Sequence, residues 1–200
     1  MATMTALTGL EGVYNWIYAG GSFQVELRPF GSFYCKSYPA TASWTLVDKV
    51  VSVDWKKFGK YELEVKDPST KSLEGGLAGN PSNWRKAEFI RPFSEAELRL
   101  LSGGSVWNFE YDQGSFEVQF HADGYNHFVC NAYPSHSHWS MEGDQLTINW
   151  GSYGDYILTV DPSGATMTGH KVGQPDNWRK ATYLRPLGPE GLALPDMHHH

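Results

Sequence analysis

Four histidines in the second half of the chain have the clearest potential for chemistry. His136 and His138 are two residues apart, so on a β-strand both imidazoles project from one face and could hold a metal ion. A third ligand could come from His121 or His127, because neighbouring strands lie about 4.8 Å apart. The spacing therefore indicates a candidate metal or acid–base site.

The surroundings of these histidines leave two interpretations open. Asp123 or Glu142 could supply an oxygen ligand or orient an imidazole, which favours a metal or general-base site. However, His136 and His138 have the opposite parity to Trp139, which places them on the solvent face, where scattered histidines are ordinary. We predict no cofactor, with His136 and His138 as the candidate ligands if a metal ion binds.

A second candidate site is a motif that occurs twice. Gly-x-Pro-x-Asn-Trp-Arg-Lys-Ala spans residues 79–87 and 173–181. In one interpretation Trp84 and Trp178 anchor a strand in the core while Arg85 and Arg179 stay in water. In the other, indole, amide and guanidinium groups are offered to a sugar or peptide, and two such loops make the protein bivalent. Because both copies keep the motif, we favour the structural role.

The motif ends a longer internal duplication, which predicts two similar units. One short insertion of two residues precedes Cys130 in the second copy. The matched pairs include Phe23 with Phe116, Cys35 with Cys130, Trp44 with Trp139, Trp55 with Trp150, and Tyr61 with Tyr156. Residues that both copies keep are expected to be scaffold, and residues found in one copy are candidates for function.

Between these anchors, apolar and polar residues alternate with a period of two. Val118 and Phe120 alternate with Gln119 and His121, and Leu146 and Ile148 follow the same pattern farther along the chain. This is typical of half-buried antiparallel strands. Turn residues recur every eight to twelve positions, so about eight short strands fit each copy, the number at which a small barrel closes.

These patterns predict an all-β protein built as a tandem internal repeat. We expect two small antiparallel up-and-down barrels, or one pseudo-twofold barrel assembly, joined by a short helix with a Ser-x-x-Glu capping box at Ser94. The expected segments are a first repeat at 1–93, a linker helix at 94–105, a second repeat at 106–187, and a tail at 188–200. The tail ends in His198–His200, which resemble the remnant of a purification tag.

Each copy resembles the calycins, the barrel group that includes lipocalins and fatty-acid-binding proteins. The resemblance rests on Trp107 in Val-Trp-Asn-Phe on the first strand and Arg185 in Tyr-Leu-Arg-Pro on the last. In the first copy, Tyr14 stands in place of the tryptophan and Arg91 closes the repeat. The calycin pattern implies that the tryptophan packs against the arginine inside the barrel.

Arg91 and Arg185 share the apolar parity of their strands with Phe89 and Tyr183. We therefore expect both arginines to face inward, where they must be paired or stacked. The resemblance to fatty-acid-binding proteins implies that they receive the carboxylate of an apolar ligand. Alternatively they close the barrel by stacking on an indole, which their presence in both copies favours.

Composition narrows the classes of partner. The formal net charge is −6 and no basic stripe is present, which argues against nucleic acid. No apolar run is long enough to span a bilayer, and the first residues lack the features of a secretory signal, so we expect a soluble, acidic, cytoplasmic protein. Eight tryptophans suit a well-packed core, and we expect Cys35 and Cys130 to be free buried thiols.

The function predicted from these observations is non-catalytic binding of a small, largely apolar ligand, with or without an anionic group. The ligand would lie in a barrel or between the repeats, and a homodimer is an option. The expected ligand-binding residues are Arg91, Arg185, Tyr183, Trp107, Trp139, Trp150 and Tyr156. One alternative is an isomerase-, lyase- or hydrolase-like enzyme that uses the second-copy histidines, namely His121, His127, His136 and His138. The other is a bivalent carbohydrate- or protein-binding module that uses the two Asn-Trp-Arg loops.

Overall fold

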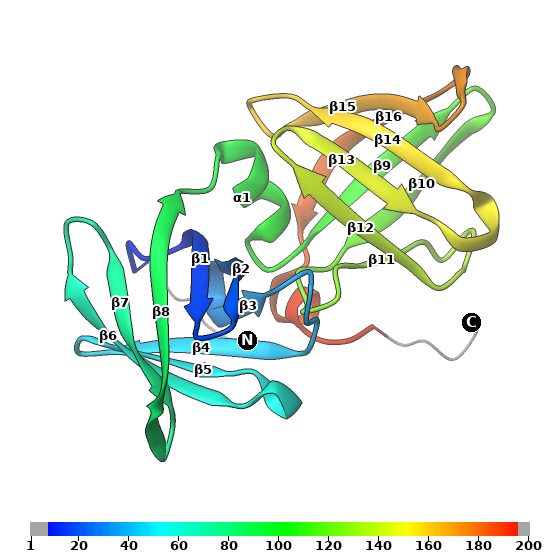
Figure 1. Ribbon diagram of the computed structural model, residues 1–200. Coiled ribbons are helices and arrows are strands. Elements are labelled where there is room, and N and C mark those ends of the chain that lie inside the picture. Colours follow the sequence, from blue (N-terminus) through cyan, green and yellow to red (C-terminus); the bar gives the residue numbers. More distant parts are fainter. Residues whose placement is uncertain (1–7, 196–200) are drawn as a thin grey trace. The chain divides into compact units, whose positions relative to one another are not determined.

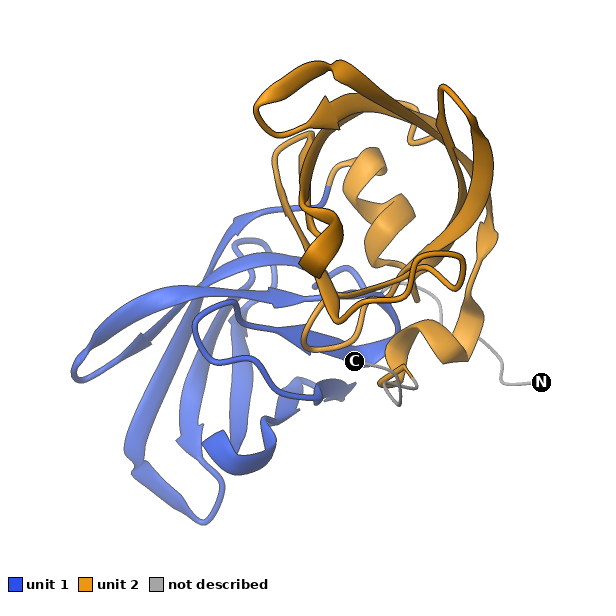
Figure 2. Ribbon diagram, turned by 90° about the vertical axis from the view of Figure 1, so that its right-hand side faces the viewer, with its two compact units in different colours: residues 1, 3–93 blue, residues 2, 94–200 orange. Residues whose placement is uncertain are grey.

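The computed structural model describes residues 8–195, so the terminal histidines lie outside the described residues. It confirms the predicted fold class: two closed eight-stranded antiparallel barrels follow one another, with a short helix between their strands (Figure 1). The chain divides into two compact units, with the boundary between Phe93 and Ser94 (Figure 2). Within residues 8–195, no helix has the length and apolar character that crossing a membrane requires.

The first barrel is an up-and-down barrel, in which each strand pairs with its neighbours in sequence and β1 also pairs with β8. Its strands are β1 (Gly12–Tyr18), β2 (Gly21–Leu27), β3 (Ser32–Tyr34), β4 (Ala42–Val47), β5 (Val50–Asp54), β6 (Lys60–Asp67), β7 (Ser72–Leu77) and β8 (Asn80–Arg91).

The second barrel repeats this order, and β9 pairs with β16 to close it. Its strands are β9 (Ser105–Tyr111), β10 (Gly114–Phe120), β11 (His127–Val129), β12 (Ser137–Glu142), β13 (Gln145–Asn149), β14 (Asp155–Val160), β15 (Thr166–Lys171) and β16 (Gln174–Pro186). Closure leaves neither barrel with a free sheet edge, which removes a common route to aggregation.

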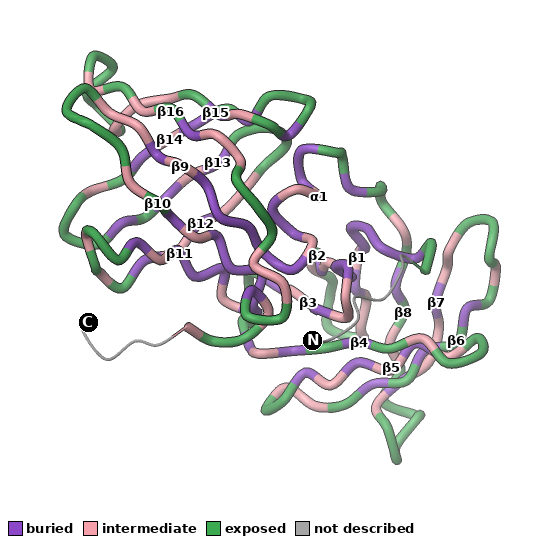
Figure 3. The backbone as a smooth tube through the Cα atoms, turned by 180° about the vertical axis from the view of Figure 1, so that it is seen from behind, coloured by how far each residue is buried: buried purple, intermediate pink, exposed green. Residues whose placement is uncertain are grey.

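Inward-facing side chains fill each barrel, and buried and exposed positions alternate along the strands (Figure 3). In the first barrel Trp16 contacts Trp55 and Tyr61 edge to face, with ring centroids 5.5 and 5.4 Å apart. In the second, Phe120 and Phe128 are fully buried, 5.2 Å apart. Such ring pairs each stabilise the fold by about 0.5–1.5 kcal/mol beyond the burial of their area.

The helix α1 (Glu95–Leu101) begins at the predicted capping box. The Ser94 side chain accepts a hydrogen bond from the Glu97 backbone, and the Glu97 carboxylate accepts one from the Ser94 backbone. Arg99 extends from the helix over the ring of Tyr183, 4.2 Å from its centroid. The helix thereby packs against the strands of the second barrel.

A β-bulge near the end of each closing strand corrects the expectation for the two matched arginines. In β16, Tyr183 pairs with Trp107 but Arg185 pairs with Val106, so the residue between them is extra. A bulge of this kind breaks the alternation of faces. Arg185 is therefore exposed and bonds the Glu117 carboxylate at 2.9 Å, and the expected packing of Trp107 on Arg185 is wrong. Arg91 follows an equivalent bulge in β8 and is exposed as well.

Both cysteines are free and buried, as predicted. Burial raises the pKa of the Cys35 thiol and of the Cys130 thiol, partly offset by backbone hydrogen bonds. A raised pKa keeps the thiol protonated and unreactive near neutral pH. Neither cysteine is a candidate nucleophile.

Candidate functional site

Each barrel contains an aromatic pocket at the end where its odd-to-even strand connections gather. The pocket of the first barrel encloses about 190 Å³ and that of the second about 140 Å³. Matched residues line the two pockets: Tyr18 and Tyr111, Phe23 and Phe116, Tyr38 and Tyr133, Trp55 and Trp150, Phe58 and Tyr153, Tyr61 and Tyr156, and Arg85 and Arg179. Trp16 adds a further ring in the first barrel.

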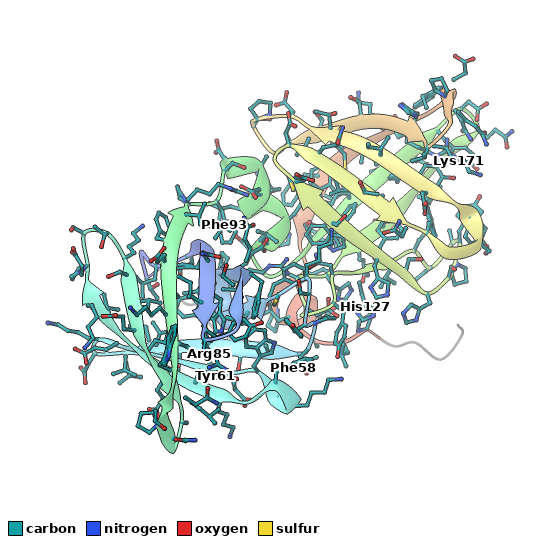
Figure 4. All side chains as sticks on the ribbon, viewed as in Figure 1. Phe58, Tyr61, Arg85, Phe93, His127 and Lys171 are labelled. Atoms are coloured by element: carbon teal, nitrogen blue, oxygen red, sulfur yellow. The ribbon has the colours of Figure 1, made fainter. Side chains whose placement is uncertain are left out.

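An arginine is the charged residue in the wall of the first pocket, and two neighbours position it. The Arg85 guanidinium donates to the Asn83 side-chain oxygen at 2.7 Å and to the Trp84 carbonyl at 2.8 Å. It lies 5.0 Å from the ring centroid of Tyr61 and 5.6 Å from that of Tyr18. Figure 4 shows Arg85 beside Tyr61 and Phe58 at one end of the barrel.

The second pocket repeats this arrangement. The Arg179 guanidinium donates to the Asn177 side-chain oxygen at 2.6 Å and to the Trp178 carbonyl at 2.8 Å. It lies 5.0 Å from the ring centroid of Tyr156 and 5.4 Å from that of Tyr111. The pocket in both barrels thus combines aromatic faces with one cation and no carboxylate in its lining.

The expected orientation of the Asn-Trp-Arg motif is wrong, because the tryptophan is exposed and the arginine turns inward. Trp84 is 40% exposed and Trp178 is 43% exposed. At the start of β8, Leu77 pairs with Asn80 but Gly76 pairs with Trp84, so the residues between Asn80 and Trp84 bulge out of register. The bulge shifts the alternation of faces and brings Arg85 to the pocket.

The other residues predicted to bind a ligand lie in three places. Trp150 and Tyr156 line the second pocket. Trp107 and Trp139 are buried in the barrel core, where their indole nitrogens donate to the Ser105 hydroxyl and to a backbone carbonyl. Tyr183 lies under Arg99 and does not line that pocket.

Three of the four second-copy histidines form a cluster outside the pockets. One nitrogen atom from each of His127, His136 and His138 lies within 4.8 Å of the other two. His127 and His138 are directly opposite each other on β11 and β12, with ring centroids 4.7 Å apart. His136 immediately precedes β12, and its ring centroid is 4.9 Å from that of His138. The prediction that His136 and His138 lie on the outer face is confirmed.

A buried carboxylate holds the imidazole of His127. The Asp123 side chain is fully buried and accepts a 2.5 Å hydrogen bond from His127 Nδ1 and a 2.9 Å bond from the His127 backbone. Although burial opposes ionisation, these bonds hold the pKa of Asp123 below its ordinary value. The charged carboxylate therefore fixes His127 with Nδ1 protonated.

The side chains of His121 and Glu142, the remaining candidates for this site, are not part of the cluster. His121 is buried, its Nε2 faces the Gln119 side-chain oxygen at 2.9 Å, and its Nδ1 has no hydrogen-bond partner among residues 8–195. Burial lowers the pKa of His121, and the charge of Asp123 opposes this effect only in part. The lowered pKa favours the neutral imidazole. Glu142 is exposed in the turn between β12 and β13.

The first barrel has the same framework without the imidazoles. Ser32 pairs with Ser43 there, as His127 pairs with His138 in the second barrel. Where the second barrel has His121, the first has the buried Arg28, which bonds Glu26 at 2.8 Å. The two-residue insertion lengthens the β10–β11 loop, and this loop carries Asp123.

Sequence reasoning identified the histidines but missed the arginine pockets. The signal that could have revealed them is that both copies keep tyrosines and arginines at matching positions near the ends of strands. These matched residues were expected to be scaffold. In comparisons with models of protein families, with curated proteins and with solved structures, no significant match to this chain was found. The function must therefore be argued from the two kinds of site.

Proposed function

We propose that the protein binds a small, flat, largely apolar ligand with an anionic group in the aromatic pocket of each barrel. The observation that carries this proposal is the matched pair of pockets, each with an arginine held by an asparagine against tyrosine faces. Aromatic walls take up an apolar ring, and the guanidinium orients a carboxylate or similar group.

The size of the pockets limits the ligand to about one ring with a short substituent. A cavity of about 150 Å³ is enough for benzene in a protein interior, and the two pockets enclose about 190 and 140 Å³. Longer chains are disfavoured because packed side chains fill the barrel below the pocket. This differs from the expected fatty-acid-binding arrangement, in which Arg91 or Arg185 receives the ligand inside the barrel.

A relation to the calycins fits this proposal at the level of fold. Both barrels have the up-and-down strand order of that group, and Trp107 is fully buried on the first strand of its barrel. Fold alone does not fix function. The pockets supply the argument for binding.

Intrinsic tryptophan fluorescence tests the proposal, because Trp55 and Trp150 line the pockets. We expect benzoate, used as the probe, to change the fluorescence in a saturable manner. Replacing both pocket arginines with Met should weaken benzoate binding by about tenfold or more, since a charge-assisted bond contributes about 1.5–3 kcal/mol. Benzamide, the neutral analogue, should bind the variant and the wild type alike.

A matched control is Arg99→Met, which removes an arginine stacked on a tyrosine away from both pockets. This variant should bind benzoate as the wild type does. Saturable binding that is equal in the wild type and in the double variant Arg85→Met/Arg179→Met would contradict the role of the arginines. Absence of saturable binding for both probes would contradict the proposal as a whole.

A bivalent carbohydrate-binding module is the second candidate, and the exposure of Trp84 and Trp178 favours it. An exposed indole next to a guanidinium offers a flat face to a sugar ring. If this is the function, binding to a glycan surface should be lost in Trp84→Ala/Trp178→Ala and weakened sharply when one unit is used alone. The enzymatic alternative receives less support, because none of the clustered histidines lines either aromatic pocket.

A further inference from the structure

We propose that His127, His136 and His138 form a binding site for a divalent transition-metal ion of the zinc class, with Asp123 as the positioning residue. This site is independent of the aromatic pockets and is present in the second barrel only. Its elements are three converging imidazoles, a buried carboxylate behind one of them, and a β10–β11 loop that is two residues longer than its counterpart in the first barrel.

In two of the three rings, those of His127 and His138, hydrogen bonds determine which nitrogen atom can bind a metal ion. His127 Nδ1 bonds the Asp123 carboxylate, and His138 Nδ1 lies 3.0 Å from the Tyr125 carbonyl, to which it donates. With Nδ1 protonated, the lone pair of each ring is on Nε2, which is the atom free to bind a metal. Histidine ligands of metal ions commonly donate their other N–H to a carboxylate or a backbone carbonyl in this way.

The spacing of the rings is close to that of a bound site. Zinc–nitrogen bonds of about 2.0–2.1 Å at tetrahedral angles place the ligand atoms about 3.3 Å apart. One ring nitrogen from each of the three histidines lies within 4.8 Å of the other two. His136 is exposed, so its side chain can rotate toward the other two rings without disturbing the barrel core.

The fold brings the rings of His127 and His138 next to each other, with centroids 4.7 Å apart and planes tilted by 34°, although the barrel does not need histidine there. The first barrel forms the same β3–β4 pair with Ser32 and Ser43, and position 41, equivalent to His136, is Thr41. The scaffold therefore does not require histidine at any of the three positions. The two extra residues in the loop that carries Asp123 are likewise not needed to close a barrel, because the first barrel closes with the shorter loop.

Three imidazoles without a thiolate suit Zn²⁺, Cu²⁺ or Ni²⁺ and disfavour Mg²⁺ and Ca²⁺, which prefer oxygen ligands. Three protein ligands leave a fourth tetrahedral position for water or an added ligand. His136 is exposed and His138 is half-buried, so solvent can reach the cluster. The site is thus open rather than fully enclosed by protein.

Calorimetric titration with Zn²⁺ alone tests the proposal, on full-length protein from which His198–His200 have been removed so that they cannot bind metal. We expect one Zn²⁺ per chain with a Kd of about micromolar or tighter, and no measurable heat from Mg²⁺. His138→Ala should weaken binding at least about tenfold, and His136→Ala should do so as well. His170→Ala is the matched control, because His170 belongs to the same barrel but not to the cluster.

Asp123→Asn separates positioning from ligation. The variant keeps an acceptor for the ring but loses the charge, and loss of such a partner weakens metal binding about 10–100-fold. Substituted Co²⁺ should give visible absorption bands of a tetrahedral site, and these bands should shift in Asp123→Asn. Circular dichroism confirms that each variant is folded.

Two results would overturn the proposal. One is a wild-type protein that shows no Zn²⁺ binding at about millimolar concentrations. The other is unchanged Zn²⁺ affinity in the folded double variant His136→Ala/His138→Ala. Neither result bears on benzoate binding in the pockets, so the two proposals stand or fall separately.

Discussion

Hydrogen bonds between residues close in the sequence orient the side chains of both candidate sites, namely the two pocket arginines and His127. Asn83 and Asn177 each hold an arginine two residues away against the rings of a pocket. Asp123 holds His127 four residues away on the outer face of the second barrel. In each case a polar side chain fixes its neighbour before any ligand arrives, which reduces the entropy lost on binding.

Tyr14 makes the first barrel sensitive to alkaline pH. Its hydroxyl is buried and donates to the Leu10 carbonyl at 2.7 Å. Burial, with a smaller effect of the Glu11 charge, raises the pKa of Tyr14 well above the ordinary value. The contribution of the protonated Tyr14 hydroxyl to the free energy of unfolding is therefore fully present below about pH 10, the ordinary pKa of tyrosine. It is lost as the pH rises from there toward the pKa of Tyr14 in the folded protein.

Urea unfolding of the wild type and Tyr14→Phe measures this effect. Near pH 8 the variant should be less stable by about 1 kcal/mol, the contribution of one hydrogen bond. The difference should shrink as the pH is raised to about 11, because only the wild type must keep a buried tyrosine protonated. A difference that stays constant over this range would contradict the assignment.

Single residues were predicted well where the alternation of the sequence is regular. The inward positions of Val118, Phe120 and Ile148 follow from a period of two, and their burial is confirmed. The outward position of His138 follows in the same way. The inward position of Arg185 was wrong because parity cannot be counted across a bulge, and the sequence carries no strong signal for one.

At the scale of elements, the bulged ends of the closing strands determine which residues reach the pockets. β7 and β15 carry a glycine directly opposite each pocket arginine: Gly75 pairs with Arg85, and Gly169 pairs with Arg179. A Cβ on Gly75 would overlap the Glu62 carbonyl and lie 2.7 Å from Leu63 Cα. The glycines are thus required by close approach of two strands.

Gly75→Ala should destabilise the first barrel by about 2–3 kcal/mol, because the added methyl group can fit only if backbone moves. Gly169→Ala should have a similar effect on the second barrel, where a Cβ would lie 2.6 Å from Leu158 Cα. Thermal unfolding measures both. Glu74→Ala is the control in the same strand, since its ion pair with Lys86 is largely exposed and should contribute little.

The order of the strands was predictable from the sequence, but the conformation of the β10–β11 loop, which places Asp123 beside His127, was not. The alternation and the turn residues predicted about eight strands in each copy, and eight are present. The insertion before Cys130 was visible in the sequence as two extra residues. That it would fold Asp123 under His127 depends on a turn at Asn126, which has a positive φ of 52°, and the sequence pattern does not specify that turn.

At the scale of the whole molecule, each unit has its own closed sheet and its own core. We therefore expect residues 1–93 and 94–200 to fold when expressed separately. Near-ultraviolet circular dichroism of each fragment should show the fixed aromatic environments of a packed core. A fragment that gives no such signal would show that its barrel depends on the rest of the chain.

Closure of the barrels also has a consequence for synthesis of the chain on the ribosome. Val13 pairs with Arg91, and Ser105 pairs with Pro186, so each ring is completed by its first and last strands. Until the last strand of a barrel has left the exit tunnel, its first strand has an unpaired edge that can capture other nascent chains. The order of translation therefore protects the first barrel before the second begins to form.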